Sequence, residues 1–284
     1  MYTGEMDWDW MLGAGALLLA AAAFAAWAWI GHARGRRLVR RPTRRLRHPV
    51  VFAHGVFGFD EISLAGRKHR YFRNIATGLG ELGNEFHHAR VPATASIAVR
   101  AARLRDLMRS LPCERVNVIA HSMGGLDARY AISRLGLGDR VASLVTIGTP
   151  HLGTPLADLG AGIVPAAVSK ALAPVFDVRA LQDLTVSGLE QFNRDTPDAP
   201  GVAYCSVTAR SSLGRTNPLL WPSHAFLSAR AGPNDGLVPL SSQKWGTVLR
   251  QIEADHWAQV GWSRRFDAVG LYRDILQELI GLGF

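Results

Sequence analysis

The chain has 284 residues, of which 48% are hydrophobic and 19% are charged, so its composition excludes extended disorder. Its two cysteines exclude a small fold built on disulfides and a zinc site built from several cysteines. The net charge of +9 is partly local, because residues 1–47 carry eight arginines and only three acidic residues. A general nucleic-acid-binding surface is therefore not indicated, and no nucleic-acid partner is expected.

Residues 10–30 form a run without a charged side chain, with tryptophans near each end. As a helix, the run would span about 32 Å, which is close to the hydrocarbon thickness of a bilayer. Tryptophan favours the headgroup level of a membrane, so these residues resemble two aromatic belts. A cleaved signal peptide would need positive charge before the run, where residues 1–9 carry only acidic charge. We therefore expect a retained single-pass transmembrane anchor.

Residues 31–47 follow this run and contain all eight arginines of the N-terminal region. A solvated linker is one interpretation of this segment. The alternative is an arginine-rich juxtamembrane collar that contacts anionic membrane lipids. The positive-inside rule places such a collar in the cytoplasm, with residues 1–9 outside. On that basis residues 48–284, which hold the candidate catalytic motifs, are expected to face the cytoplasm.

Residues 48–284 alternate between strand and helix patterns. Short apolar runs predict strands at 49–53, 86–91, 115–120, 141–147, 202–207 and 247–252. Helical spacing of apolar residues predicts helices at 71–82, 97–111, 124–135 and 266–280. This alternation predicts the α/β class, with a mostly parallel sheet covered by helices on both faces.

The segment Ala120-His121-Ser122-Met123-Gly124 carries the strongest chemical signal. It matches the G-x-S-x-G nucleophile elbow, with alanine in the first position. Such an elbow raises the serine hydroxyl above a sheet at a sharp turn from strand to helix. Here a predicted strand precedes the motif and a predicted helix follows it, as the elbow requires. The sequence therefore predicts that Ser122 is a nucleophile.

A serine nucleophile needs a general base, which is oriented by an acid. After an elbow of this kind the acid and then the histidine follow along the chain. His256 lies just after the last predicted strand and is the expected base, since His151 comes too early and no suitable acid precedes His224. Asp235, in an Asn-Asp-Gly turn, is the expected acid, although this tripeptide is also simple turn chemistry. Asp255 adjoins the histidine and cannot easily reach its ring.

An oxyanion hole needs two backbone N–H groups that point toward the developing negative charge. Met123, the residue after the nucleophile, is expected to supply one of them. Val56, in the glycine-containing loop after the first predicted strand, is expected to supply the other.

Four stretches together resemble the bacterial triacylglycerol lipases of the α/β-hydrolase superfamily: residues 49–60, 120–130, 145–153 and 234–239. The resemblance implies an α/β-hydrolase fold and hydrolysis of acyl esters, including lipid esters, through an acyl-enzyme. It assigns the same residues as nucleophile, acid and base, and the same two oxyanion donors. An acyltransferase with the same triad remains an alternative. A non-catalytic membrane scaffold is a weaker one, because no member of the triad is damaged.

The chain departs from the secreted relatives at their structural calcium site. Ala258 stands where the resemblance predicts an aspartate, and no aspartate lies between Asp198 and Asp235. We therefore expect no metal site and no cofactor. Cys205 could match one end of the relatives' disulfide but Cys113 does not match the other, so two free thiols are expected. Residues 155–196 lie where this family inserts a lid, and they are equally compatible with a packed cap.

Overall fold

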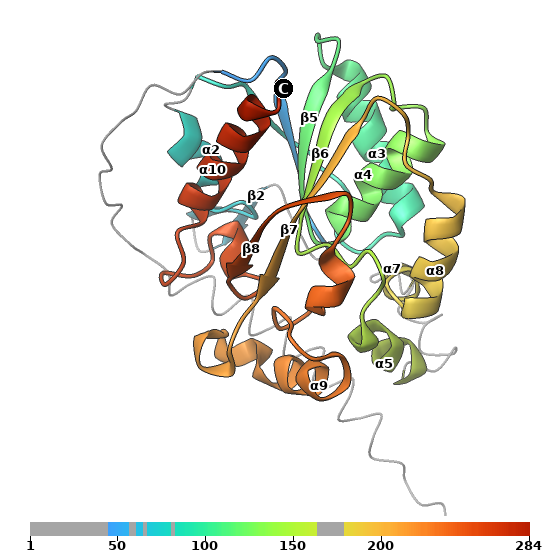
Figure 1. The fold of residues 1–284 in the computed structure, drawn as a ribbon, viewed down its shortest axis with the longest axis vertical. Coiled ribbons are helices and arrows are strands. Elements are labelled where there is room, and N and C mark those ends of the chain that lie inside the picture. Colours follow the sequence, from blue (N-terminus) through green and yellow to red (C-terminus); the bar gives the residue numbers. More distant parts are fainter. Residues whose placement is uncertain (1–44, 57–60, 65–66, 81–82, 164–178) are drawn as a thin grey trace, which may run out of the picture.

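The computed structural model describes residues 45–56, 61–64, 67–80, 83–163 and 179–284 (Figure 1). A six-stranded parallel sheet forms the centre of this part, in the order β4-β1-β5-β6-β7-β8. Its strands are β1 (Val50–Ala53), β4 (Phe86–His88), β5 (Val116–His121), β6 (Val141–Ile147), β7 (Ala203–Arg210) and β8 (Thr247–Glu253). Each of the six predicted strands is therefore present, and the α/β prediction is confirmed.

Helices cover both faces of this sheet (Figure 1). α2 (Ile75–Leu79) and α10 (Ala268–Gly281) lie on one face, and α3 (Ile97–Ser110) and α4 (Met123–Arg134) lie on the other. Strand β1 explains this division, because successive side chains of a strand point to opposite faces. Val50 and Phe52 enter the core beneath α2 and α10, whereas Val51 and Ala53 enter the core beneath α3 and α4. A strand buried on both faces favours apolar residues at successive positions, as in β1.

Helix α2 is shorter than the predicted helix at 71–82. It begins after Asn74, which has a left-handed backbone with φ of 59°. The two preceding aromatic residues, Tyr71 and Phe72, are buried outside the helix, and the Phe72 ring lies 5.0 Å from the ring of Phe52. Apolar residues with helical spacing thus serve here as core-filling loop residues, which shortens the helix.

Two features of the fold were not predicted from the sequence. One is an antiparallel hairpin formed by β2 (Glu61–Leu64) and β3 (Arg67–Arg70), which lies outside the main sheet. The other is α9 (Trp221–Ala231), which lies with α5 (Pro155–Ile163) at the lower end of the molecule in Figure 1. In sheets of this class, the loops that follow the carboxyl ends of the parallel strands form the ligand-binding and catalytic sites.

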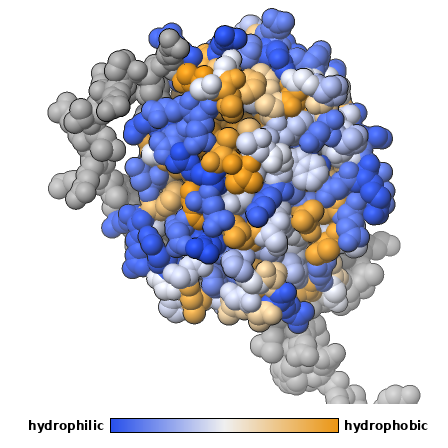
Figure 2. Space-filling model, in the orientation of Figure 1, coloured by the Kyte–Doolittle hydropathy of each residue, from blue (hydrophilic) through white to orange (hydrophobic). Residues whose placement is uncertain are grey.

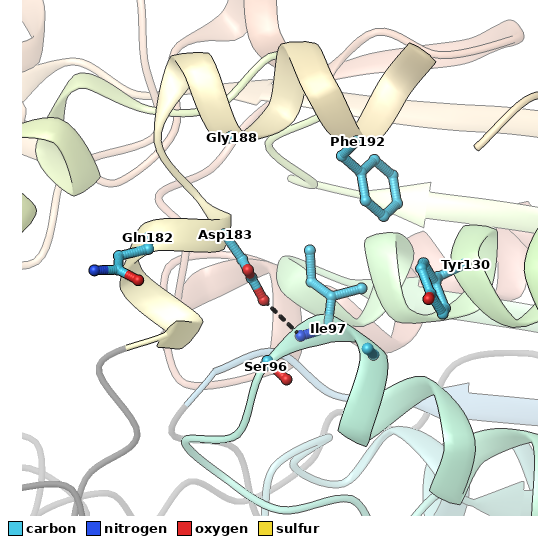
Figure 3. Close-up of a pocket in the computed structure, with 8 residues that line it drawn as sticks. Ser96, Ile97, Tyr130, Gln182, Asp183, Gly188 and Phe192 are labelled. Carbon is cyan, nitrogen blue, oxygen red and sulfur yellow. Dashed lines mark hydrogen bonds between the residues drawn. The ribbon is translucent and has the colours of Figure 1, made fainter. Parts of the chain in front are cut away.

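The described part of the expected lid region contains α5, α7 (Arg179–Asp183) and α8 (Val186–Asp195). These helices pack on the N-terminal ends of α3 and α4 through an apolar cluster that includes Ile97 and Leu189. A pocket of about 310 Å³ remains between α7, α8 and the helices α3 and α4, and the side chains of Ile97, Tyr130 and Phe192 face it (Figure 3). Asp183 accepts a hydrogen bond from the Ile97 backbone N–H at 2.8 Å, which ties α7 to the start of α3.

The predicted transmembrane anchor at 10–30 lies outside the described residues, as does most of the linker at 31–47. Within the part of the chain that the structure describes, no helix combines the length and the apolar character that a membrane crossing needs.

Candidate active site

Ser122 occupies a sharp turn between β5 and α4. Its backbone has φ of 56° and ψ of −135°, a conformation that non-glycine residues rarely adopt. Gly124 permits the turn, because a Cβ atom there would lie 2.5 Å from the Ala53 carbonyl oxygen and 2.7 Å from that of His54. The start of α4 therefore lies directly against the loop that follows β1. This is the geometry of a nucleophile elbow, and the strain is consistent with a functional position.

Asp235 and His256 form a buried pair at the same edge of the sheet. The Nδ1 of His256 lies 2.8 Å from Oδ2 of Asp235. The other carboxylate oxygen accepts hydrogen bonds from the backbone N–H groups of Leu237 at 3.0 Å and Val238 at 2.8 Å. The Asn-Asp-Gly turn thus fixes the carboxylate, and the carboxylate fixes the imidazole. With Nδ1 donating to Asp235, Nε2 of His256 is left to accept a proton.

The His256 ring lies beside the nucleophile elbow. Its centroid is 4.5 Å from that of His121, the residue that immediately precedes Ser122. The structure thus brings Ser122, Asp235 and His256, which are far apart in the sequence, to one end of the sheet. A serine beside a histidine that is oriented by a carboxylate is the arrangement that nucleophilic catalysis by serine needs.

The expected oxyanion residues flank this serine. A Cβ atom on Gly55 would lie 2.7 Å from Cβ of Ser122 and 3.0 Å from its Oγ, so the loop backbone directly adjoins the serine side chain. Val56 follows in this loop and packs on the apolar cluster that contains Met123. Both backbone segments that were expected to supply N–H donors therefore lie next to Ser122.

Arg100 anchors the loop that carries Val56. Its guanidinium donates to the His54 carbonyl at 2.6 Å, to the Pro92 carbonyl at 2.6 Å and to Oδ2 of Asp127 at 2.9 Å. Arg100 and Asp127 are both buried, and burial raises the pKa of the Asp127 carboxyl to about 6 although Arg100 acts to lower it. The signal in the sequence was a single arginine on the core-facing side of an otherwise apolar helix pattern.

The other two histidines considered as bases have different partners. His151 is buried beside Thr146, with its Nε2 3.1 Å from the threonine hydroxyl. Burial, followed by the nearby charge of Arg129, lowers its pKa well below the ordinary value. His224 places its Nε2 2.8 Å from the carbonyl oxygen of Ser211. Both rings thus have structural hydrogen bonds.

Asp255, the rejected acid, caps the loop that carries His256. Its carboxylate accepts backbone N–H bonds from Asn217 at 2.9 Å, Trp257 at 3.0 Å and Ala258 at 2.8 Å.

The described residues include no group of three or more histidine, cysteine or acidic side chains that could hold a metal ion. Within that same part of the chain, Cys113 and Cys205 are free thiols.

Comparison with known proteins identifies the family. The profile of the alpha/beta hydrolase fold matches residues 86–187. A triacylglycerol lipase from Vibrio cholerae is 30% identical over 273 residues, which cover 82% of this chain and 85% of that protein. The chain belongs to the triacylglycerol lipase family. This lipase is therefore an ester-hydrolysing serine hydrolase.

Further comparisons agree with this assignment. The lipase is 28% identical to a triacylglycerol lipase from Pseudomonas fragi over 280 residues, covering 80% of this chain and 94% of that protein. In structure it is similar to a metagenomic carboxyl esterase, with a TM-score of 0.72, 19% identity and coverage of 86% and 79% of the two chains. Staphylococcus hyicus lipase gives a TM-score of 0.66 at 19% identity, with coverage of 86% and 99%. These similarities confirm the α/β-hydrolase fold.

Proposed function

We propose that the protein is a membrane-anchored lipase that cleaves acyl esters of lipids through an acyl-enzyme on Ser122. The observation that carries this proposal is the buried pair of Asp235 and His256, joined at 2.8 Å beside the strained turn of Ser122. A buried carboxylate that orients a histidine beside a serine has a clear chemical use, which is to activate the hydroxyl. The relatives from Vibrio cholerae and Pseudomonas fragi are triacylglycerol lipases, which agrees with this chemistry.

The first half-reaction forms the acyl-enzyme. Oγ of Ser122 attacks the ester carbonyl carbon while Nε2 of His256 takes the hydroxyl proton. The negative charge on the carbonyl oxygen is stabilised by the backbone N–H groups of Val56 and Met123. The ester C–O bond then breaks, and His256 returns its proton to the departing alcohol. Asp235 stabilises the imidazolium that forms between these two transfers.

The second half-reaction releases the fatty acid. Water attacks the acyl carbon, and its proton passes to Nε2 of His256. The bond between the acyl carbon and Ser122 Oγ breaks, and the proton returns to the serine. The carboxylic acid leaves, and the resting enzyme is restored.

A lipid substrate is supported by the surface at this end of the molecule. Leu152, Leu159 of α5 and Trp221 of α9 are exposed by 51%, 42% and 45%. Apolar patches interrupt the polar surface along the lower edge in Figure 2, the end at which α5 and α9 lie in Figure 1. Exposed apolar side chains beside a hydrolase site favour contact with a lipid surface. The expected anchor at 10–30 and the arginines at 31–47 would hold the enzyme at such a surface, with the catalytic domain in the cytoplasm.

A series of ester substrates tests this proposal. The full chain in detergent micelles is assayed on p-nitrophenyl esters from acetate to palmitate and on triacylglycerol emulsions, with Ser122→Ala as the control. We expect turnover of esters that the control does not cleave, with activity extending to long acyl chains. Equal background rates for the two proteins on every substrate would refute the proposal, and activity confined to acetate would refute its lipid part.

A further inference from the structure

Asp235 has a second side-chain partner besides the histidine. Nε2 of Gln259 lies 2.9 Å from Oδ2 of Asp235, the same oxygen that bonds to His256. Gln259 is fully buried and lies in a short turn of 3-10 helix, η5 (Ala258–Val260), three residues after His256. Within the described residues, Oδ2 of Asp235 thus has two side-chain partners, His256 and Gln259, while Oδ1 accepts from two backbone N–H groups.

A chain of hydrogen bonds fixes which way the Gln259 amide points. Its Oε1 lies 3.2 Å from Nε2 of His121, and Nδ1 of His121 lies 2.7 Å from the hydroxyl of Tyr71. An ionised Asp235 can only accept, so the Gln259 NH₂ donates to it and Oε1 faces His121. His121 therefore carries its proton on Nε2 and donates it to Oε1 of Gln259. Its Nδ1 is then an acceptor for the Tyr71 hydroxyl, which keeps its proton because burial raises the pKa of Tyr71.

The protonation state of His121 agrees with this direction. Burial, followed by the neighbouring charge of His256, lowers the pKa of His121 well below its ordinary value. The ring is therefore neutral, and it can accept from Tyr71 on one nitrogen while it donates to Gln259 from the other. A protonated ring could not accept from Tyr71.

The backbone of Gly148 lies directly against the Gln259 amide. Gly148, at the end of β6, has φ of 57°, and a Cβ atom there would lie 2.3 Å from Oε1 of Gln259. At the other end of this series of hydrogen bonds, the Gly55 backbone also hydrogen-bonds the Tyr71 hydroxyl. The hydrogen bonds thus run without a gap from the loop expected to form the oxyanion hole to the carboxylate of Asp235.

We propose that Gln259 is a positioning residue for the catalytic acid, held in register by His121 and Tyr71. This inference rests on the proposed roles of Asp235 and His256. The amide holds the carboxylate toward the imidazole, and it withdraws part of the negative charge that would otherwise stabilise protonated His256. Because the Gln259 amide is neutral, the hydrogen-bonded pair of Asp235 and Gln259 carries a single negative charge, on Asp235. Loss of the amide would therefore strengthen the attraction between Asp235 and a protonated His256.

The test uses two substitutions that remove the donor at similar volume, Gln259→Met and Gln259→Leu. Both changes stabilise protonated His256, so the acidic limb of kcat/KM against pH should move to higher pH. We expect a shift of about half a pH unit for each variant. On a soluble ester at neutral pH, kcat should fall about tenfold or more while KM changes less than twofold.

Asn117 provides the control. It is a buried amide at the start of β5, where its side chain accepts a hydrogen bond from Ser143 at 2.7 Å and donates to the His48 carbonyl at 3.3 Å. Asn117→Leu should lower Tm without moving the acidic limb. If the Gln259 variants lower Tm in the same way and leave both the limb and kcat unchanged, Gln259 is a structural residue and the proposal is wrong.

A second measurement does not depend on activity. The His256 ring is titrated by NMR in the full chain, with His256→Ala used to assign its signal. The midpoint should rise in both Gln259 variants, and an unchanged midpoint would overturn the proposal. Failure of the proposed function would look different, because the unmodified protein would then hydrolyse esters no faster than Ser122→Ala.

Discussion

Asp235 and His256 are joined twice. Besides the side-chain bond, the backbone N–H of His256 donates to the backbone carbonyl of Asp235 at 2.8 Å. The second bond ties the loop after β8 to the turn that carries the acid. The imidazole is thus held by its backbone as well as by its ring, which favours a pre-organised base. The backbone bond would also survive a change of the Asp235 side chain to asparagine.

Gly124 should be intolerant of any side chain. Gly124→Ala would push α4 away from the carbonyl oxygens of Ala53 and His54, which a Cβ atom would approach to 2.5 and 2.7 Å. We expect a loss of about 1–3 kcal/mol in the free energy of unfolding, measured in urea, together with most of the activity. Gly162→Ala is the control, because a Cβ atom there meets no atom of the described residues within 4 Å. A Gly124→Ala protein as stable as this control would contradict the elbow geometry.

The buried carboxyl of Asp127 should make stability depend on pH. Its pKa is about 6 in the folded protein against an ordinary 3.8, so between these values the folded state holds the proton more tightly than the unfolded chain. This group therefore makes the protein less stable as pH rises from about 4 to about 6. In Asp127→Asn that dependence is removed. The free energy of unfolding of the variant, relative to that of the parent, should therefore rise as pH increases across this window.

Urea unfolding at pH 4, 5, 6 and 7 measures this difference. Parallel stability curves for the two proteins would show that the raised pKa is wrong.

Arg100→Met is the companion variant, since it leaves the buried carboxyl unpaired and releases the loop at His54. It should cost about 3–5 kcal/mol of stability at neutral pH.

Much of the fold was predictable because its signals are local. The β1 strand is apolar at every position and β5 at four of its six, and the Ser122 motif lies between strand and helix patterns, so each could be recognised from adjacent residues. The roles of Arg100 and Gln259 could not be recognised, because their partners are distant in sequence. Arg100 bonds to Asp127 and His54, and Gln259 bonds to His121, which lies 138 positions away. Such contacts follow only once the sheet has brought its edges together.

Metal removal should have no effect on the enzyme. Ala258 is buried where the resemblance places a calcium-binding aspartate, and the neighbouring Asp255 is occupied by three backbone N–H groups. Tm and ester hydrolysis should be the same in EDTA and in calcium. A fall in Tm with EDTA that calcium restores would reveal a metal site and contradict this expectation.

Charge predicts the orientation of the proposed anchor in the membrane. Eight arginines directly follow the expected span at 10–30, and only acidic residues precede it. Because cationic flanks are retained on the cytoplasmic side, the catalytic domain should lie there. Alkaline phosphatase fused after Phe284 should be inactive, and a cytoplasmic reporter at the same site should be active. The opposite pattern would indicate an exported domain.

The central claim is that Ser122 forms the acyl-enzyme with His256 and Asp235 as its base and acid. Mass spectrometry after labelling with a fluorophosphonate tests it most directly, together with ester turnover of Ser122→Ala, His256→Ala and Asp235→Asn. We predict one adduct, on the peptide that contains Ser122, and losses of several orders of magnitude in turnover for each variant. His224→Asn should keep most of the activity. An adduct on another residue, or a His256→Ala protein as active as His224→Asn, would contradict the account.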